Sequence, residues 1–158
     1  PYPNERGIAV TEHNRFCGKF EFLEHTADVR IAAYGSSLEE AFGNAAIAMF
    51  EVMTDSTKIS PAIKGTVEVE AEDEYALLYS WLEALLVKFE VDGMLVSRFE
   101  VQPIEDKKDR FSLKATIYGE KFDPKKHPQK VGVKAVTYHQ MEIIKEIEQT
   151  ILMFLLDI

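Results

Sequence analysis

Several side chains that could bind a metal ion lie in one short segment of the sequence, Glu24-His25-Thr26-Ala27-Asp28. It offers an imidazole, a hydroxyl and two carboxylates, and so both nitrogen and oxygen ligands. The segment alone is weak evidence for a site. Asp28 also suits a turn, and a histidine such as His25 is more often a hydrogen-bonded structural side chain. A turn and a ligand cluster both remain open interpretations.

The last two residues of the sequence add further carboxylates. Asp157 contributes a side chain, and the α-carboxylate of Ile158 is ionised at neutral pH. If the apolar run before them forms a buried strand, both groups are held at its end. Neighbouring carboxylates repel each other unless a cation joins them. A solvated terminus is the simpler alternative, and the residue types alone favour it.

A basic segment contains Lys125, Lys126, His127 and Lys130, and could meet a phosphate or an acidic partner. Most such clusters are solvated loops. The whole chain carries a net charge of -9, whereas proteins that grip nucleic acid through its phosphates concentrate Lys and Arg. Any contact with RNA is therefore expected to be indirect.

Other catalytic devices are absent from the sequence. It has no Gly-rich phosphate loop with Lys and Ser or Thr, no dinucleotide fingerprint and no cysteine-histidine metal spacing. Nothing resembles a nucleophile elbow, although a Ser-His-Asp triad can assemble from distant residues. These patterns argue against nucleotide hydrolysis by the chain alone.

Predicted strands flank the first segment. Alternating apolar and polar residues indicate strands at 19–24 and 29–34. After Gly35, either Ser36 or Ser37 can cap a helix, because each is followed three residues later by a glutamate. Apolar residues then recur at three- and four-residue spacing, which predicts an amphipathic helix lying on a sheet.

A further strand and helix follow in the sequence. Residues 66–71 alternate again, and Glu72, Asp73 and Glu74 place negative charge where a helix N-terminus favours it. Leucine and aromatic residues then form a broad stripe, which predicts the centre of the core. Asp92-Gly93 ends this second helix with residues typical of a turn.

The last third of the chain is predicted to be mostly strand, at residues 94–101, 111–118, 131–141 and 150–156. We expect residues 105–110 to form a hairpin loop, and residues 142–149 to form a loop before the final strand. The isoleucine spacing in this last segment would also suit a helix, but a buried strand is preferred.

The predicted fold is therefore one α+β domain, a mixed and mostly antiparallel β-sheet with two amphipathic helices packed on it. A chain of 158 residues with 46% hydrophobic content suits a single core. Residues 1–18 are expected to be a flexible N-terminal arm and residues 19–158 the domain. Cys17 is the single cysteine, and no membrane span or signal peptide is visible, so a cytoplasmic protein is expected.

Several stretches together carry a specific family resemblance: residues 24–28, 35–42, 69–73, 77–82, 118–120, 133–139 and 157–158. Through them the chain resembles the archease family from about Phe20 to Ile158. The resemblance implies an α+β protein that assists the RNA ligase of tRNA splicing, which joins tRNA halves at 2′,3′-cyclic phosphate ends. The assistance consists of promoting guanylylation of the ligase and its turnover. The resemblance implies no ligase or other enzyme activity for the chain itself.

The resemblance also implies a set of site residues. A divalent cation would be held by the side chains of Asp28 and Asp157 and by the carboxylate of Ile158. His25, Lys134 and His139 are implied as functional neighbours. All-oxygen ligation favours Ca²⁺, with Mg²⁺ or Mn²⁺ as alternatives, over Zn²⁺.

Two other functions remain as alternatives. The chain could be a chaperone or specificity modulator for an RNA-modifying enzyme such as a tRNA methyltransferase, with the metal only tying the C-terminus to the fold. It could also be a stand-alone metal-dependent hydrolase. The Asp28→Ala substitution separates the three, because it should abolish ligase stimulation, leave chaperoning intact, or stop turnover without a partner.

Overall fold

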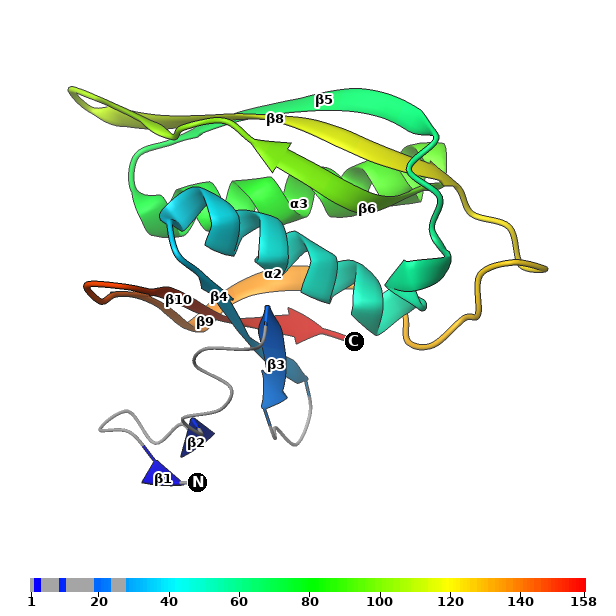
Figure 1. The fold of residues 1–158 in the computed structure, drawn as a ribbon, viewed down its shortest axis with the longest axis horizontal. Helices are drawn as coiled ribbons and strands as arrows, with labels where there is room; N and C mark the ends of the chain where they lie inside the picture. Colours follow the sequence, from blue (N-terminus) through cyan, green and yellow to red (C-terminus); the bar gives the residue numbers. More distant parts are fainter. Residues whose placement is uncertain (1, 4–8, 11–18, 24–27) are drawn as a thin grey trace.

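The computed structural model describes residues 2–3, 9–10, 19–23 and 28–158 of the chain. Its two long helices lie in a layer between two β-sheets (Figure 1). In chain order the elements are β1 (Tyr2–Pro3), β2 (Ala9–Val10), β3 (Phe20–Leu23), β4 (Val29–Gly35), α2 (Leu38–Met53), the 3₁₀ helix η1 (Ser56–Lys58), β5 (Ile63–Ala71), α3 (Glu74–Asp92), β6 (Met94–Val101), β7 (Glu105–Lys107), β8 (Arg110–Lys121), β9 (Ala135–Lys145) and β10 (Thr150–Asp157).

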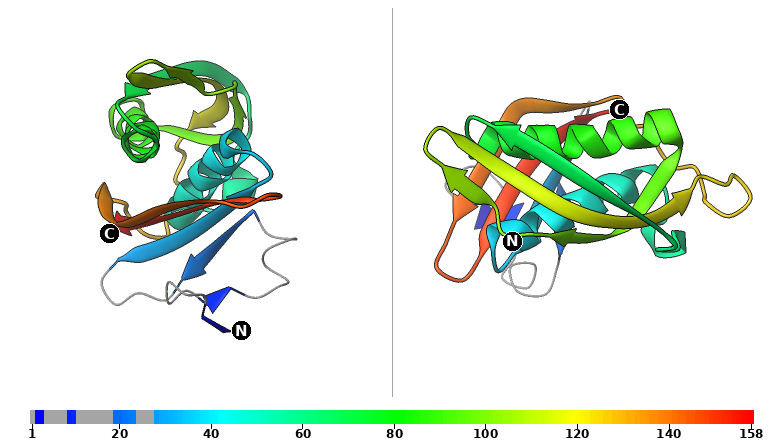
Figure 2. Two further views of the ribbon diagram at one scale, coloured as in Figure 1. Left: turned by 90° about the vertical axis from the view of Figure 1, so that its left-hand side faces the viewer. Right: turned by 90° about the horizontal axis from the view of Figure 1, so that it is seen from above.

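Apart from the two-stranded pair of β1 and β2, the strands divide between two four-stranded sheets. One has the order β3-β4-β10-β9, and the other has the order β5-β8-β6 with β7 also paired to β8. Every strand pair among the described residues is antiparallel. Seen from the side, the sheets lie on opposite sides of α2 and α3 (Figure 2). The final strand, β10, is central in its sheet, between β4 and β9.

Helix α2 begins at a predicted cap. The Ser37 hydroxyl accepts a hydrogen bond from the Glu40 N–H at 3.1 Å, which satisfies one of the free donors at a helix N-terminus. The Glu40 carboxylate returns to the N–H of Ser36 at 3.3 Å, one residue earlier than in a standard capping box. Gly35 precedes this turn because a Cβ there would lie 2.4 Å from the Ala41 nitrogen. The turn therefore fixes how α2 leaves β4.

Helix α3 is also delimited by local signals. The Asp73 carboxylate accepts a hydrogen bond from the Ala76 N–H at 2.7 Å, and Gly93 ends the helix with φ of 68°. The Trp81 indole N–H donates to the Phe42 carbonyl of α2 at 3.0 Å. Sheets cover α3 from two sides, so its fully buried residues lie around more than one face: Leu77, Leu78, Trp81, Leu82, Leu85 and Leu86.

The predicted α+β class, the antiparallel strands and the two helices are confirmed. The final segment is a strand, as preferred over a helix. The structure adds that the strands of the domain, β3 to β10, form two separate sheets. Among the described residues, no helix is long and apolar enough to cross a membrane. The predicted arm, residues 1–18, lies outside the described residues except for the short pair β1 and β2.

Two predicted loops are wrong in part. Most of the loop expected at 105–110 is strand, because β7 folds back on β8 and leaves only Lys108-Asp109 as the turn. The loop expected at 142–149 is shorter, because β9 continues to Lys145. Ile143 and Ile144 pair with β10, which explains the isoleucine-rich composition of that stretch.

The strand predicted at 131–141 begins four residues late, at Ala135. Its first residue and the one before it instead serve the end of α2: the N–H groups of Val131 and Lys130 donate to the carbonyls of Val52 and Met53, at 3.2 and 3.0 Å. The last carbonyls of a helix need such partners. Apolar alternation cannot reveal this use of the backbone.

Candidate metal site

The strand register brings Asp28 beside Asp157. At the end of β10, Leu156 pairs with Val29 of β4 on one side. The ladder ends there, and Asp28, in a bend before β4, and Asp157, the last residue of β10, are the next residues on the two chains. Residues far apart in the sequence therefore meet at one end of the sheet.

The end of β10 is anchored in the core. Leu152, Phe154 and Leu156 are completely buried and belong to the main hydrophobic core between the sheets. Ile158 continues this alternation, and its half-buried side chain packs against the same core. Asp157, with the opposite parity, lies on the sheet face turned away from the helices. Packing therefore holds the carboxylates at this end.

Two of the predicted neighbours lie at different distances from the end of β10. The N–H of Lys134 donates to the Asp157 carbonyl at 2.7 Å, and the exposed Lys134 side chain begins at this point. His139 is also exposed, but it lies further along, in the irregular stretch that faces Phe154. The structure thus brings Lys134, and not His139, next to the end of β10. His25 lies outside the described residues.

The two aspartates at this end of the sheet differ in their partners. No described residue forms a hydrogen bond or an ion pair with the Asp157 side chain. Asp28 does have an interaction partner. The residue types fit a hard cation: three carboxylate groups supply only oxygen donors. Within the described ranges, no three His, Cys, Asp or Glu side chains converge as metal ligands, so the third donor in the proposed set is the main-chain carboxylate of Ile158.

Arg30 was missed by the sequence analysis. It pairs with Leu155, so alternation places it on the same sheet face as Asp157, two residues from Asp28. Its Nε is buried, and no described group accepts a hydrogen bond from it. A cation two residues from an aspartate on a strand could have been noticed in the sequence.

The basic segment is used internally. His127 is completely buried, and its Nδ1 accepts a hydrogen bond from the Asp123 N–H at 2.9 Å. The ring proton is therefore on Nε2, which donates to Glu120 at 3.0 Å. The Lys126 ammonium contacts the same Glu120 oxygen at 2.6 Å and the Ser60 hydroxyl at 2.7 Å. We call Glu120, Lys126, His127 and Ser60 the Glu120 cluster.

Hydrogen bonds control the ionisation of Glu120. Desolvation opposes its charge, but hydrogen bonds from Lys126, the Ser60 N–H and His127 outweigh that effect and lower the pKa of Glu120 to about 2. Lys130 similarly binds Glu51 at 2.8 Å. Burial disfavours the Glu51 carboxylate, but Lys130 and Ser56 lower its pKa overall. These basic residues therefore stabilise the fold.

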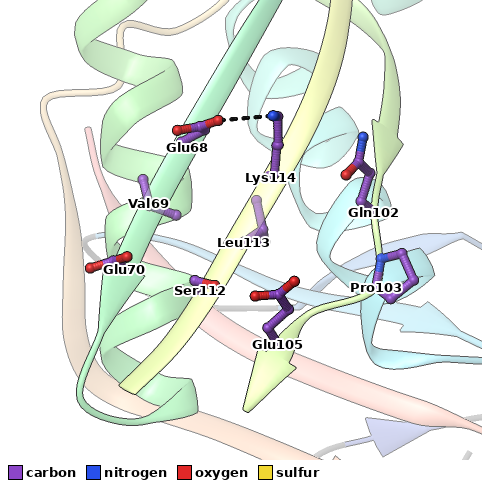
Figure 3. Close-up of a pocket in the computed structure, with 9 residues that line it drawn as sticks. All are labelled: Glu68, Val69, Glu70, Gln102, Pro103, Glu105, Ser112, Leu113 and Lys114. Atoms are coloured by element: carbon purple, nitrogen blue, oxygen red, sulfur yellow. Dashed lines mark ion pairs between the residues drawn. The ribbon is translucent and has the colours of Figure 1, made fainter. Parts of the chain in front are cut away.

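A hollow of about 410 Å³ lies on the outer face of the other sheet (Figure 3). Glu68 of β5 and Lys114 of β8 form an ion pair of 3.2 Å across it, and both side chains are mostly exposed. Glu70 also lines the hollow and pairs with Arg110 at 3.3 Å. The glutamates that line this hollow form ion pairs with neighbouring cations.

Comparison with known proteins identifies close relatives. The model of the archease protein family matches residues 20–158. Protein archease of Sulfurisphaera tokodaii is 49% identical over 140 residues, which are 89% of this chain and 99% of that protein. Protein archease of Pyrococcus abyssi is 49% identical over 127 residues, 80% of this chain and 89% of that protein.

Two solved structures share the fold. The solution structure of protein 1598 of Methanobacterium thermoautotrophicum has a TM-score of 0.76 and 42% identity, covering 89% of this chain and 99% of that one. The crystal structure of a Thermotoga maritima archease, described as a possible chaperone, has a TM-score of 0.55 and covers 87% and 96% of the two chains. With 16% identity, the second structure supports the fold alone.

Proposed function

This chain belongs to the archease family, and from that premise we propose that it is an accessory protein of the tRNA-splicing RNA ligase. It promotes guanylylation and turnover of the ligase and uses a bound divalent cation, with Ca²⁺ first and Mg²⁺ or Mn²⁺ as alternatives. It acts as an activator in the cytoplasm and catalyses no reaction by itself.

The observation that supports this proposal is the strand register, which ends with Leu156 opposite Val29 and leaves Asp28 and Asp157 as the next residues on the two chains. The side chains of both residues and the carboxylate of Ile158 would hold the cation. When bound, a divalent cation supplies positive charge that can neutralise a nucleoside triphosphate during nucleotidyl transfer. The Asp157 side chain has no described partner, so this charge is available to a cation.

The surrounding residues prepare these ligands. The central position of β10 and the packing of Ile158 fix the strand end, so little conformational freedom is lost when a ligand binds. The hydrogen bond from Lys134 to the Asp157 carbonyl fixes the adjacent main chain. The Lys134 ammonium then lies where it can meet a phosphate, and His25 and His139 remain proposed neighbours.

Contact with RNA is proposed to pass through the ligase. The chain has a net charge of -9, which repels a polyanion. Lys126 and Lys130, which could have served as phosphate ligands, are paired with Glu120 and Glu51. The partner is therefore a protein.

Multiple-turnover ligation of RNA ends tests the proposal. The ligase is assayed alone, with the wild-type chain, with Asp157→Ala, and with a chain extended by a few residues beyond Ile158. The extension converts the terminal carboxylate into an amide and removes one ligand. We expect stimulation by the wild type and a loss of most of it with both variants.

Two controls make the result specific. The same extension at the N-terminus leaves Ile158 unchanged, and Glu68→Gln removes one carboxylate from the ion-paired outer sheet face. Both should stimulate the ligase like the wild type. Equal stimulation by all five proteins would reject the site, and no stimulation by the wild type would reject the function.

A further inference from the structure

A stacked aromatic pair lies at the surface of helix α3, with one ring half-buried and the other exposed. The rings of Tyr79 in α3 and Tyr138 in β9 are stacked, with centroids 4.4 Å apart and planes 7° from parallel. Tyr138 is 52% exposed, and Tyr75, one helical turn before Tyr79, is 43% exposed. Helix α3 and β9 lie along each other at one side of the molecule (Figure 2). Large exposed aromatic rings are frequent at protein interfaces.

Carboxylates without counter-ions surround the aromatic pair. Glu72, Asp73 and Glu83 form no ion pair with any described residue, although Asp73 caps α3. Desolvation, Tyr79 and then these three acids raise the pKa of Tyr138. These carboxylates therefore lie close enough to the Tyr138 ring to act on it electrostatically. We call Glu72, Tyr75, Tyr79, Glu83 and Tyr138 the α3–β9 face.

The backbone of β9 changes its course where it presents Tyr138. The pairing with β10 jumps from Glu142 opposite Met153 to Thr137 opposite Leu155, so the residues between them bulge from the ladder. Gln140 in this bulge has φ of 56°, a left-handed conformation that costs a non-glycine residue energy. The bulge interrupts the free edge of the sheet, which disfavours docking by simple strand addition.

The charge pattern differs from that of the opposite sheet face. There, Glu68, Glu70 and Glu100 pair with Lys114, Arg110 and Arg98. The unbalanced charge on the α3–β9 face is thus a local property and does not follow from the net charge alone. A complementary occupant must bring cations, and an aromatic face favours a guanidinium or an ammonium group.

We propose that the α3–β9 face docks a protein segment that carries arginine or lysine side chains, with one cation over the Tyr79–Tyr138 stack and others at the carboxylates. Proteins that handle RNA concentrate such side chains on their surface. The identification of the partner as the ligase rests on the proposed function. The occupant's chemistry, a cationic protein segment, rests on the α3–β9 face itself.

Docking there would orient the candidate metal site. Ala135, the first residue of β9, pairs with Asp157, and Tyr138 follows three residues later on the same strand. A partner seated on the α3–β9 face therefore lies near the end of β10, across the sheet edge from the Asp157 side chain. In this proposal, the partner is recognised by one stretch of β9, and the cation is bound beside the first residue of that strand.

The first experiment uses the purified ligase as the probe. Its affinity is measured for the wild-type chain, Tyr138→Ala, the double substitution Glu72→Gln with Glu83→Gln, and Glu68→Gln as a control on the paired face. We expect about tenfold weaker binding for the first two variants and less than a twofold change for Glu68→Gln. Rising salt should weaken wild-type binding more steeply than binding of the double variant.

Asp157→Ala separates this inference from the proposed function. It should bind the ligase like the wild type and fail to stimulate it. Wild-type affinity for Tyr138→Ala and for the double variant would overturn the docking face, even if stimulation by the wild type is observed. An equal loss for Glu68→Gln would also overturn it, because binding would then follow net charge.

A second probe covers the case in which the ligase is not the partner. A nonapeptide of alternating arginine and glycine is titrated into the labelled chain, and amide NMR shifts are mapped. Shifts concentrated at 72–83 and 137–140, and lost in Tyr138→Ala, would support the docking face without the ligase. Shifts spread over all acidic surfaces, or stronger shifts with a short RNA, would reject it.

Discussion

The Glu120 cluster and the end of β10 both gather charged groups, but Glu120 and Asp157 differ in the partners that the described residues supply. Glu120 receives hydrogen bonds from Lys126, His127 and the Ser60 N–H. Asp157 lies beside Asp28 and has no described partner for its side chain. One group of charges therefore completes the fold, whereas the other can still bind a ligand.

The difference shows how motif composition can mislead. Lys126 and His127 are residue types that often bind phosphate, yet both side chains bind the carboxylate of Glu120. Asp157 is an ordinary aspartate by residue type, yet at its position no described residue binds its carboxylate. Availability of a side chain, and not its type, distinguishes a ligand from a structural residue.

The largest expected effect on stability is at Glu120. We expect Glu120→Gln to lower the free energy of unfolding by about 3 kcal/mol at neutral pH, because Lys126 loses its charged partner in a site where Glu120 is only 19% exposed. Glu68→Gln, in an exposed pair, should change stability by less than about 0.5 kcal/mol. Urea denaturation measures both, and equal losses would erase the contrast between buried and exposed pairs.

Acid should remove the contribution of Glu120. Its pKa is about 2 in the folded chain against an ordinary value of 4.5, so the unfolded chain binds protons first as pH falls. The stabilisation, about 3 kcal/mol, is fully present above pH 4.5 and is lost as pH falls through 2. The stability difference between wild type and Glu120→Gln should shrink over that window. A difference that stays constant from pH 6 to pH 2 would contradict the assignment.

The end of β10 should respond to added metal instead. At one hundred times its dissociation constant, Ca²⁺ should raise the free energy of unfolding by about 2.7 kcal/mol. Asp28→Ala should remove this gain, and Glu120→Gln should keep it despite its lower baseline. Thermal unfolding with Ca²⁺ or with a chelator measures the gain. No gain with Ca²⁺, Mg²⁺ or Mn²⁺ would leave the carboxylates without a metal role.

The smallest expected effect on stability is that of Asp157→Asn, and its sign should differ between the metal-free and the Ca²⁺-bound protein. In chelator, Asp157→Asn should raise the free energy of unfolding by about 0.5 kcal/mol, because it removes repulsion between neighbouring carboxylates. With saturating Ca²⁺ the same substitution should destabilise the chain relative to wild type. Chemical denaturation under both conditions detects the reversal, and a loss of stability in chelator would contradict it.

Features set by neighbouring residues could be predicted from the sequence. The starts of α2 and α3 depend on the caps Ser37 and Asp73, and the end of α3 on Gly93. The pairing of Asp28 with Asp157 was reached through family resemblance, since the register of β4 against β10 depends on residues far apart in the chain. The site residues themselves remain a prediction.

Features set by tertiary contacts were not predicted. Lys130 and Val131 cap the distant end of α2, so their segment is not strand despite its alternation. Gly119 shows the same limit: a Cβ there would lie 1.8 Å from the Leu95 carbonyl oxygen, a constraint that only the packed sheet creates. Local pattern identifies elements, and packing decides how their backbone groups are used.

The central position of β10 also sets an order for biosynthesis. Val29 of β4 pairs with Leu156 of β10, so β4 cannot pair with β10 until β10 has been synthesised. The segments β3, β4 and α2 leave the ribosome long before that point. Such distant pairing slows folding and leaves apolar strand faces exposed in the meantime. A nascent chain of this protein is therefore most prone to aggregation just before its final strand emerges.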